Sequence, residues 1–377
     1  MATALKHQDN GWEQVLYMAL ELSNSKWKLA FSAGDGIRKK SLDAGDLGAL
    51  EREIGKAKQR FRLGEDCRVV SVYEAGRDGF WIHRALGGWG IESLVVDSAS
   101  IEVNRKQRRA KTDNVDVEAL IRQLMRFAGG ERRALSVVRV PTVEAEDQRR
   151  LHRERERVLT ERGAHSARIQ SLLIAQGIRR KVTPELLEEV EELRSPAGYP
   201  LGEDLKAEIR REYERYRLAD EQIRGLERTQ RERLEADPSG ALQQVRSLLQ
   251  LRGVGWVSSW TLVMEFFAWR GFRNRKQLAA CAGLTPTPYS SGEMERDQGI
   301  SKAGNRRIRT LLVELSWLWL RYQPDSALTL WYQKRFAGGG KRMRRIGIVA
   351  MARKLLIALW RYVKEGQVPE GAVFKAI

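Results

Sequence analysis

The chain has 377 residues, of which 42 % are hydrophobic, and a net charge of +18. This length accommodates two or three domains, and the charge favours a polyanionic partner, nucleic acid before an anionic membrane. No apolar run approaches the length of a membrane span, and residues 1–14 lack the apolar run of a signal peptide. Cys67 and Cys281 are far apart and the four histidines show no ligand spacing, so we expect no disulfide and no zinc site, which fits a cytoplasmic location.

The N-terminal third alternates strand and helix patterns. Residues 15–32 contain an apolar run followed by an alternating pattern, which predicts two strands joined by a turn at 23–25. Further along the chain we predict strands at 68–74 and 91–97, and helices at 46–61, within 76–89 and at 115–127. Strands that alternate with helices predict an α/β unit with a mixed sheet.

The middle of the chain is dense in Arg and Glu. Residues 142–176 and about 202–235 carry sparse leucines and are separated by a segment that contains Pro184, Pro196 and Pro200. We predict two long helices that form an antiparallel, coiled-coil-like hairpin. This hairpin is either a solvated spacer or a surface that contacts RNA or mediates dimerisation.

The C-terminal region, from about residue 241, is predicted to be helical with denser hydrophobic residues. Gly253 and Gly255 separate two apolar helical segments, and they serve either as a tight packing turn or as a phosphate contact. The tryptophans of this region fall on apolar helical faces, so core packing is favoured over base stacking: Trp317, Trp319, Trp331 and Trp360.

Four acids have an unusual placement. Glu21 and Glu74 end apolar strands, and Asp113 and Asp116 form an Asp-x-x-Asp at the start of a helix. A carboxylate at the end of a buried strand is costly unless a cation neutralises it, and Mg²⁺ prefers oxygen ligands. The joint placement predicts one Mg²⁺ site. The alternative treats each acid separately, as a turn residue, a helix cap or a residue of the first helical turn. Asp97 and Glu118 rank lower as ligands.

Two adjacent hydroxyl groups stand out in the C-terminal region. Ser290 and Ser291 lie in the Pro/Gly-rich stretch 285–292, for which we expect a loop. A cationic segment follows, with Lys302, Arg306, Arg307 and Arg309 as candidate contacts to nucleic acid. A serine beside so much positive charge favours attack on a phosphodiester over attack on an acyl group. The alternative for the cations is an ordinary solvated helix face.

Together these residues resemble a known family. The acids in the order first strand, later strand, Asp-x-x-Asp resemble a RuvC-like nuclease core. The spaced downstream motif resembles the C-terminal domain of the DEDD-type insertion-sequence transposases, closest to the branch typified by the insertion sequence numbered eleven-eleven. The motif comprises Gly283-Leu-Thr-Pro, Ser291-Gly292, Gly299-Ile-Ser-Lys302 and Gly304-Asn305.

The resemblance implies an architecture and a mechanism. It implies a RuvC-like (RNase H-like) α/β domain at 14–130, a helical coiled-coil linker at 142–235 and a mainly α transposase domain at 241–366. The activity implied is RNA-guided DNA recombination, in which a structured bridge RNA pairs with target and donor DNA. The acids and a serine would form a composite site with a 5′-phosphoserine intermediate, in a dimer or tetramer.

Two positions need comment against the family pattern. The first acid of the family is usually Asp, whereas this chain has Glu21, which is still an oxygen ligand. The serine that directly precedes glycine is Ser291, with Ser290 as the second choice. The alternative functions are a metal-dependent, structure-selective nuclease and a non-catalytic nucleic-acid-binding protein.

Overall fold

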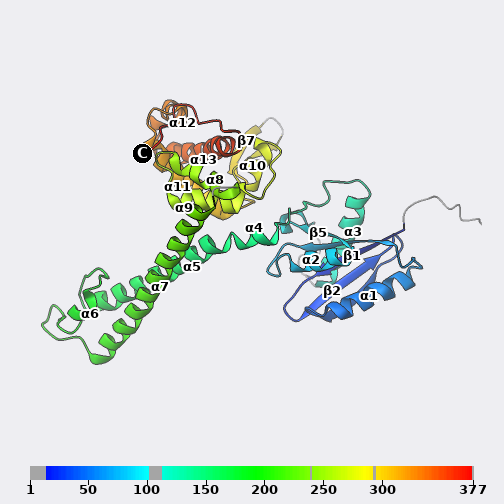
Figure 1. Ribbon diagram of the computed structural model, residues 1–377, viewed down its shortest axis with the longest axis horizontal. Coiled ribbons are helices and arrows are strands. Elements are labelled where there is room, and N and C mark those ends of the chain that lie inside the picture. Colours follow the sequence, from blue (N-terminus) through cyan, green and yellow to red (C-terminus); the bar gives the residue numbers. More distant parts are fainter. Residues whose placement is uncertain (1–13, 102–112, 238–239, 292–293, 376–377) are drawn as a thin grey trace, which may run out of the picture. The chain divides into compact units, whose positions relative to one another are not determined.

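The structure is a computed structural model that describes residues 14–101, 113–237, 240–291 and 294–375 (Figure 1). The chain divides into two compact units, Met1–Val140 and Pro141–Ile377, and each is described by itself. Among the described residues, no helix is both long enough and apolar enough to cross a membrane.

A mixed five-stranded sheet forms the centre of the first unit. The strands follow the order β3-β2-β1-β4-β5, in which β1 is antiparallel to β2 and parallel to β4, and β4 is parallel to β5. Their bounds are β1 Val15–Glu21, β2 Lys26–Ser32, β3 Arg38–Asp43, β4 Arg68–Glu74 and β5 Glu92–Val96. The predicted strands are confirmed. Strand β3 was missed because it is an edge strand with only Leu42 buried, so its sequence shows no apolar pattern.

Helices cover both faces of this sheet, which gives an α/β fold. They are α1 Leu47–Arg60, α2 Trp81–Gly88 and α3 Asp113–Ala128, with the short η1 Ser98–Ser100. Leu16, Met18 and Leu20 of β1 pack in one cluster with α1 and α2. The alternate residue Ala19 packs in another cluster with α3. Burial on both faces explains why β1 reads as an almost continuous apolar run.

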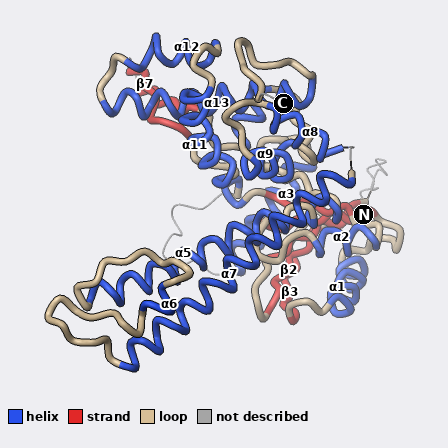
Figure 2. Tube along the Cα trace, turned by 60° about the vertical axis from the view of Figure 1, so that its left-hand side comes forward, coloured by secondary structure: helices blue, strands red, loops and turns tan. Residues whose placement is uncertain are grey.

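The second unit begins with the predicted helical hairpin. Its helices are α4 Val143–Asp147, α5 Arg150–Ala175, α6 Leu186–Glu189 and α7 Glu203–Ala236, and α5 and α7 lie side by side (Figures 1 and 2). Polar contacts join residues that become closer in sequence toward the tip: the ion pairs of Arg155 with Glu227 and Arg162 with Asp220, and the hydrogen bond between His165 and Glu212. This pattern confirms an antiparallel pair.

The tip of the hairpin has a small hydrophobic core that was not predicted. It combines the end of α5, the α6 region and the start of α7, with Ile169, Leu173, Leu186, Val190, Ile209 and Tyr213 among its buried residues. Halfway along the hairpin the buried apolar cluster shrinks to Val158, Ala219 and Ile223. The packing of α5 against α7 in the middle of the hairpin is therefore stabilised mainly by ion pairs.

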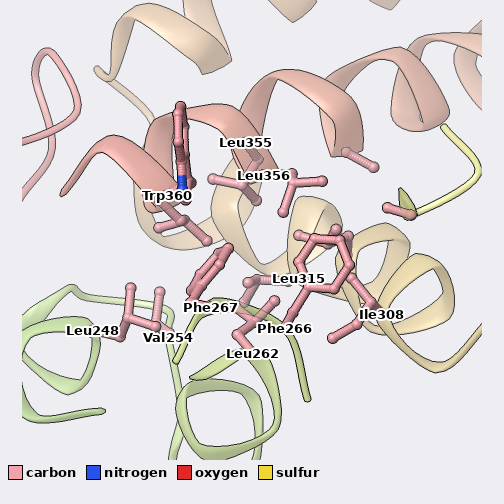
Figure 3. Packing of buried hydrophobic residues seen from close by; sticks show 14 of the residues in the cluster. Leu248, Val254, Leu262, Phe266, Phe267, Ile308, Leu315, Leu355, Leu356 and Trp360 are labelled. Carbon is pink, nitrogen blue, oxygen red and sulfur yellow. The ribbon is translucent and has the colours of Figure 1, made fainter. Parts of the chain in front are cut away.

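The remaining residues form a mainly helical bundle with a large core (Figure 3). Its elements are α8 Gly240–Gln250, α9 Trp256–Leu262, the π-helical η3 Val263–Phe267, α10 Arg275–Cys281, β6 Pro286–Ser291, β7 Met294–Ile300, α11 Arg306–Tyr322, α12 Ala327–Tyr332, the π-helical η4 Gln333–Ala337 and α13 Lys341–Glu365. Phe266 of η3, Leu315 of α11 and Leu356 of α13 meet in this core (Figure 3).

Several sequence interpretations of this bundle can be compared with the structure. Trp319 and Trp360 are buried as predicted, but Trp317 is 49 % exposed, because it lies on the opposite face of α11 from Trp319. Gly253 has φ +85°, and a Cβ there would lie 3.0 Å from Tyr322, so this glycine allows a tight packing turn. Cys67 and Cys281 form no disulfide among the described residues, and both are only partly buried.

Candidate active site

Glu21 and Glu74 end adjacent parallel strands of the first unit. Leu20 of β1 lies opposite Tyr73 of β4, and each acid is the next residue of its strand. The two acids line one cavity of about 410 Å³ at the carboxyl edge of the sheet. Because parallel strands deliver their ends to the same edge, the sequence prediction that these two carboxylates lie together is supported for this pair.

Other oxygen-bearing side chains line the same cavity. They belong to Ser23 and Asn24 in the β1–β2 turn and to Asp78 after β4. The sequence analysis did not name Asp78 as a candidate ligand, because it lies in a turn and not at a strand end. The guanidinium of Arg77 lies 3.8 Å from its carboxylate. Carboxylate, amide and hydroxyl oxygens are ligands that Mg²⁺ accepts, so this donor set fits a hard divalent cation.

Helix α3 packs on the sheet against β1 and β2. Lys39 Nζ lies 3.1 Å from Glu118 of α3, and Lys39 is in the same row of the sheet as Ala19. Two turns further along α3, Met125 lines a cavity together with Ser32, which pairs near the beginning of β1. These contacts suit a helix that advances toward the start of β1, and on that arrangement its first turn is expected toward the end of β1.

The first turn of α3 carries Asp113 and Asp116. These residues precede Glu118 by about 3–8 Å along the helix axis, while Glu21 lies about 7 Å beyond Ala19 along the strand. Asp116 is half-buried, and the side chain of Asp113 lies outside the described part of the chain. Among the described side chains, no group of three or more His, Cys, Asp or Glu is placed to hold a metal ion. The convergence of all four acids stays a prediction.

The two lower-ranked acids differ from this set. Asp97 follows the end of β5 and is exposed, and it is not among the residues that line the Glu21–Glu74 cavity. Glu118 accepts hydrogen bonds from Lys39 and Arg122, and those bonds lower the pKa of its carboxyl.

The candidate serines lie on a β-hairpin, so the expectation of a loop was wrong. Ser290 and Ser291 are the last residues of β6, opposite Glu295 and Met294 of β7. The side chains of both serines lie outside the described part of the chain. Pro286 and Pro288 fit this strand because each strand is paired on one side only and the register shifts between them.

Backbone hydrogen bonds hold the base of this hairpin. The amide of Ser301 donates to Thr285 O over 2.9 Å, and the amide of Asn305 donates to Cys281 O over 2.8 Å. Between them the amide of Lys302 donates to Gly283 O over 3.2 Å. The segments before and after the hairpin therefore form one paired base beside α10 and α11.

Two glycines of the resemblance motif are required by this base. Gly283 has φ +66°, and a Cβ there would lie 2.6 Å from Ala303 O. Gly304 has φ +121°, and a Cβ there would lie 2.5 Å from Cys281 O. Real Cβ atoms do not approach carbonyl oxygens so closely, and L side chains rarely adopt such φ values. The backbone of the hairpin base therefore requires glycine at these two motif positions, whether or not they take part in the reaction.

The four candidate nucleic-acid cations fall into two groups. Lys302 and Arg306 are exposed, and Lys302 has a positive φ of +56°, which is uncommon for a residue with a side chain. Arg307 pairs with Glu156 and Glu265, and Arg309 donates to Ala282 O over 3.2 Å. The first two are therefore available to a ligand, whereas the other two are engaged within the fold.

A buried ion cluster joins the hairpin to the bundle, and sequence reasoning missed it. Glu265, on η3, is 1 % exposed and accepts hydrogen bonds from Arg153 of α5 and Arg307 of α11. His152 Nε2 lies 3.0 Å from the same carboxylate. Burial would raise the pKa of Glu265, but the hydrogen bonds from His152 and Arg153 and the charge of Arg153 hold it well below its ordinary value.

Comparison with known proteins identifies the family. A protein designated as a transposase, y4rJ of Sinorhizobium fredii, is 43 % identical over 96 % of this chain and 94 % of its own length. The model of the Transposase IS116/IS110/IS902 family matches residues 245–330, from α8 to α12. The chain belongs to this transposase family.

More distant relatives carry the same activity in their names. The transposase for insertion sequence element IS1111A of Coxiella burnetii is 27 % identical over 78 % of this chain and 76 % of its own length. The transposase for insertion sequence element IS1328 of Yersinia enterocolitica is 24 % identical over 68 % of this chain and 73 % of its own length. As an insertion-sequence transposase, this protein is an enzyme of DNA transposition and binds DNA. A non-catalytic binding role is thereby excluded.

Proposed function

We propose that this transposase cuts and rejoins DNA through a composite site. Glu21, Glu74, Asp113 and Asp116 hold Mg²⁺, and Ser291 is the nucleophile, with Ser290 as second choice. The observation that carries this proposal is the placement of Glu21 and Glu74 on one cavity at the carboxyl edge of the sheet. This arrangement is what the RuvC-like resemblance of the first unit implies.

The reaction would proceed by transesterification. The Ser291 hydroxyl oxygen forms a bond to phosphorus, its proton passes to a base or to water, and the bond to the 3′ oxygen breaks, which leaves a 5′-phosphoserine link. Mg²⁺ at the four acids would stabilise charge on the phosphate oxygens. A serine hydroxyl is a weak nucleophile and needs such help. The acids that assist it belong either to the same chain or to another subunit.

We further propose that a structured noncoding RNA selects the DNA by base pairing. The support is the family resemblance together with the net charge of +18, which suits a protein that binds mainly backbones. The α5–α7 hairpin would contact RNA or another subunit in a dimer or tetramer. In this scheme the functional domains are 14–130, 142–235 and 241–366, and the enzyme works in the bacterial cytoplasm.

The nucleophile can be tested with a matched pair of variants. Full-length protein is incubated with labelled DNA from the element end, the noncoding RNA beside the gene and Mg²⁺, and covalent adducts are resolved on a denaturing gel. Ser291→Ala should remove the adduct, whereas Ser290→Ala should only weaken it. Loss of the adduct in Ser290→Ala alone would shift the assignment by one residue. An adduct in both variants would show that another side chain forms the link, whereas DNA cleavage without any adduct by the native protein would favour the metal-dependent nuclease.

A further inference from the structure

The last third of the chain has a strong local charge imbalance. From Ser326 to Lys364 there is no Asp or Glu, but there are ten Lys or Arg residues. Six of these cations fall between residues 334 and 345, on η4 and the first turns of α13: Lys334, Arg335, Lys341, Arg342, Arg344 and Arg345. We call residues 334–346 the basic corner.

The cations of the basic corner are exposed and lack acidic partners. All six are exposed, and none of them forms an ion pair with a described residue. The hairpin helices differ in this respect, because many of their arginines form ion pairs with acids, such as Arg157 with Glu161 and Arg224 with Asp220. Unmatched positive charge concentrates polyanions at this corner.

The basic corner is also preformed. Phe336 is buried against α13, and a Cβ at Gly347 would lie 2.5 Å from its ring, so the glycine permits this close approach. Tyr332 Oη donates to Arg344 O over 3.4 Å. The η4 segment and the start of α13 are therefore packed together, and binding need not order the backbone that carries the cations.

The aromatic residues here favour duplex over single-stranded nucleic acid. Proteins that bind single strands combine cations with exposed aromatic rings on which bases stack. At the basic corner, Tyr332 and Phe336 are buried, and Lys354 lies over the ring of Trp331 at 4.6 Å. The exposed apolar side chains are instead aliphatic, Met343 and Ile346. These features suit contact with a phosphate backbone.

We propose that the basic corner is a binding site for the backbone of double-stranded DNA. Lys341 and Arg345 are about 6 Å apart along the α13 axis, so neighbouring cations can reach successive phosphates. The site lies outside the residues 245–330 that match the family model and apart from Lys302 and Arg306 in sequence. It does not depend on the identity of the nucleophile.

The test measures the salt dependence of DNA binding by the full-length protein. The probe is duplex DNA of unrelated sequence, and fluorescence anisotropy gives the affinity at several salt concentrations. The double variant Arg342→Gln/Arg345→Gln should lower the magnitude of the slope of log K against log salt by about 2 and weaken binding at least about tenfold near 0.1 M salt. The control variant Arg68→Gln/Arg126→Gln, whose arginines pair with Glu92 and Glu131 in the first unit, should leave both unchanged.

Each outcome decides for or against the proposal. Arg342→Lys/Arg345→Lys should restore the slope, because Lys keeps the charge, and circular dichroism should show that all variants are folded. Equal slopes for the double variant and the control would overturn the site. A second arm uses the structured RNA as probe. If the double variant loses RNA binding but keeps duplex DNA binding, the site is an RNA site and the DNA assignment is wrong.

Discussion

His152 Nε2 lies 3.0 Å from a carboxylate oxygen of Glu265, although 113 residues separate the two in sequence. The contact joins the base of the hairpin to the core of the bundle, and Arg153 and Arg307 complete it. A buried carboxylate is tolerated only where cations and hydrogen bonds compensate its desolvation. The cluster therefore fixes where the hairpin leaves the bundle.

Glu265→Gln should destabilise the second unit by about 3 kcal/mol, because it removes the charge that compensates three cationic or polar partners. The lowered pKa of Glu265 sets the pH dependence. The stabilisation is complete above about pH 5 and is lost as pH falls below about 4, because the unfolded state then takes up a proton that the folded state excludes. Urea unfolding at several pH values should show the difference between the native protein and the variant shrinking toward low pH. A pH-independent difference would contradict this account.

Arg306 and Arg307 are adjacent but should have different roles. Arg306→Gln should weaken DNA binding and leave the free energy of unfolding within about 0.5 kcal/mol of the native value, because its side chain is exposed. Arg307→Gln should instead lower stability, because it removes ion pairs to Glu156 and Glu265. Anisotropy binding and thermal unfolding of both variants separate the two effects. Equal losses of stability would show that the structural distinction is wrong.

Gly304→Ala should damage the base of the serine hairpin. The new Cβ would meet Cys281 O at 2.5 Å, and φ is +121°, so a loss of about 2–3 kcal/mol is expected. Gly163 in α5 is the control, because a Cβ there meets nothing within 4 Å. Gly163→Ala should stabilise the protein by about 0.5–1 kcal/mol. The measurement is chemical unfolding, and an unaffected Gly304→Ala protein would rule out the proposed constraint.

Asp113→Asn should abolish recombination without loss of stability, because the side chain is nearly isosteric but carries no charge for Mg²⁺. Glu118→Gln is the matched control on the same helix, since Glu118 is paired with Lys39 and Arg122. It should keep activity. Recombination is scored by strand joining in Mg²⁺, with circular dichroism as the check on folding. Full activity of Asp113→Asn would remove this acid from the proposed metal site.

The outer part of the hairpin should be required for assembly. A chain in which residues 164–214 are replaced by a short Gly/Ser turn loses the tip core but keeps His152 and Arg153 with Glu265. The bundle should therefore still fold, while sedimentation velocity should show a smaller assembly. If the shortened protein still assembles with RNA and recombines, the hairpin is only a spacer.

Local patterns predicted much of the first unit. Strands β1 and β4 were found because both faces are buried, and their ends located Glu21 and Glu74. Strand β3 was missed because it has one buried residue, Leu42. The family motif located the serines but not the hairpin, because a two-stranded ribbon tolerates prolines that argue against a strand in a larger sheet.

Long-range electrostatics could not be predicted from sequence. Glu265 lies between apolar residues and gives no local signal of its cationic partners, which come from α5 and α11. Because its acidic partners are distant in sequence, Arg307 was grouped with Lys302 and Arg306 as a candidate contact to nucleic acid. The charge imbalance between residues 326 and 364 was readable from the sequence, but only the structure showed that the six cations of the basic corner are exposed and form no ion pair with a described residue.

The hairpin has an apolar core at its tip, a buried ion cluster at its base and only a small apolar cluster between them. The length of the hairpin is therefore set by the number of helical turns in its middle, where few apolar side chains pack together. Removing seven facing residues from each of α5 and α7 would shorten the hairpin by about 10 Å and leave both of its ends intact. The length of the hairpin could therefore change without any change to the residues that stabilise its two ends.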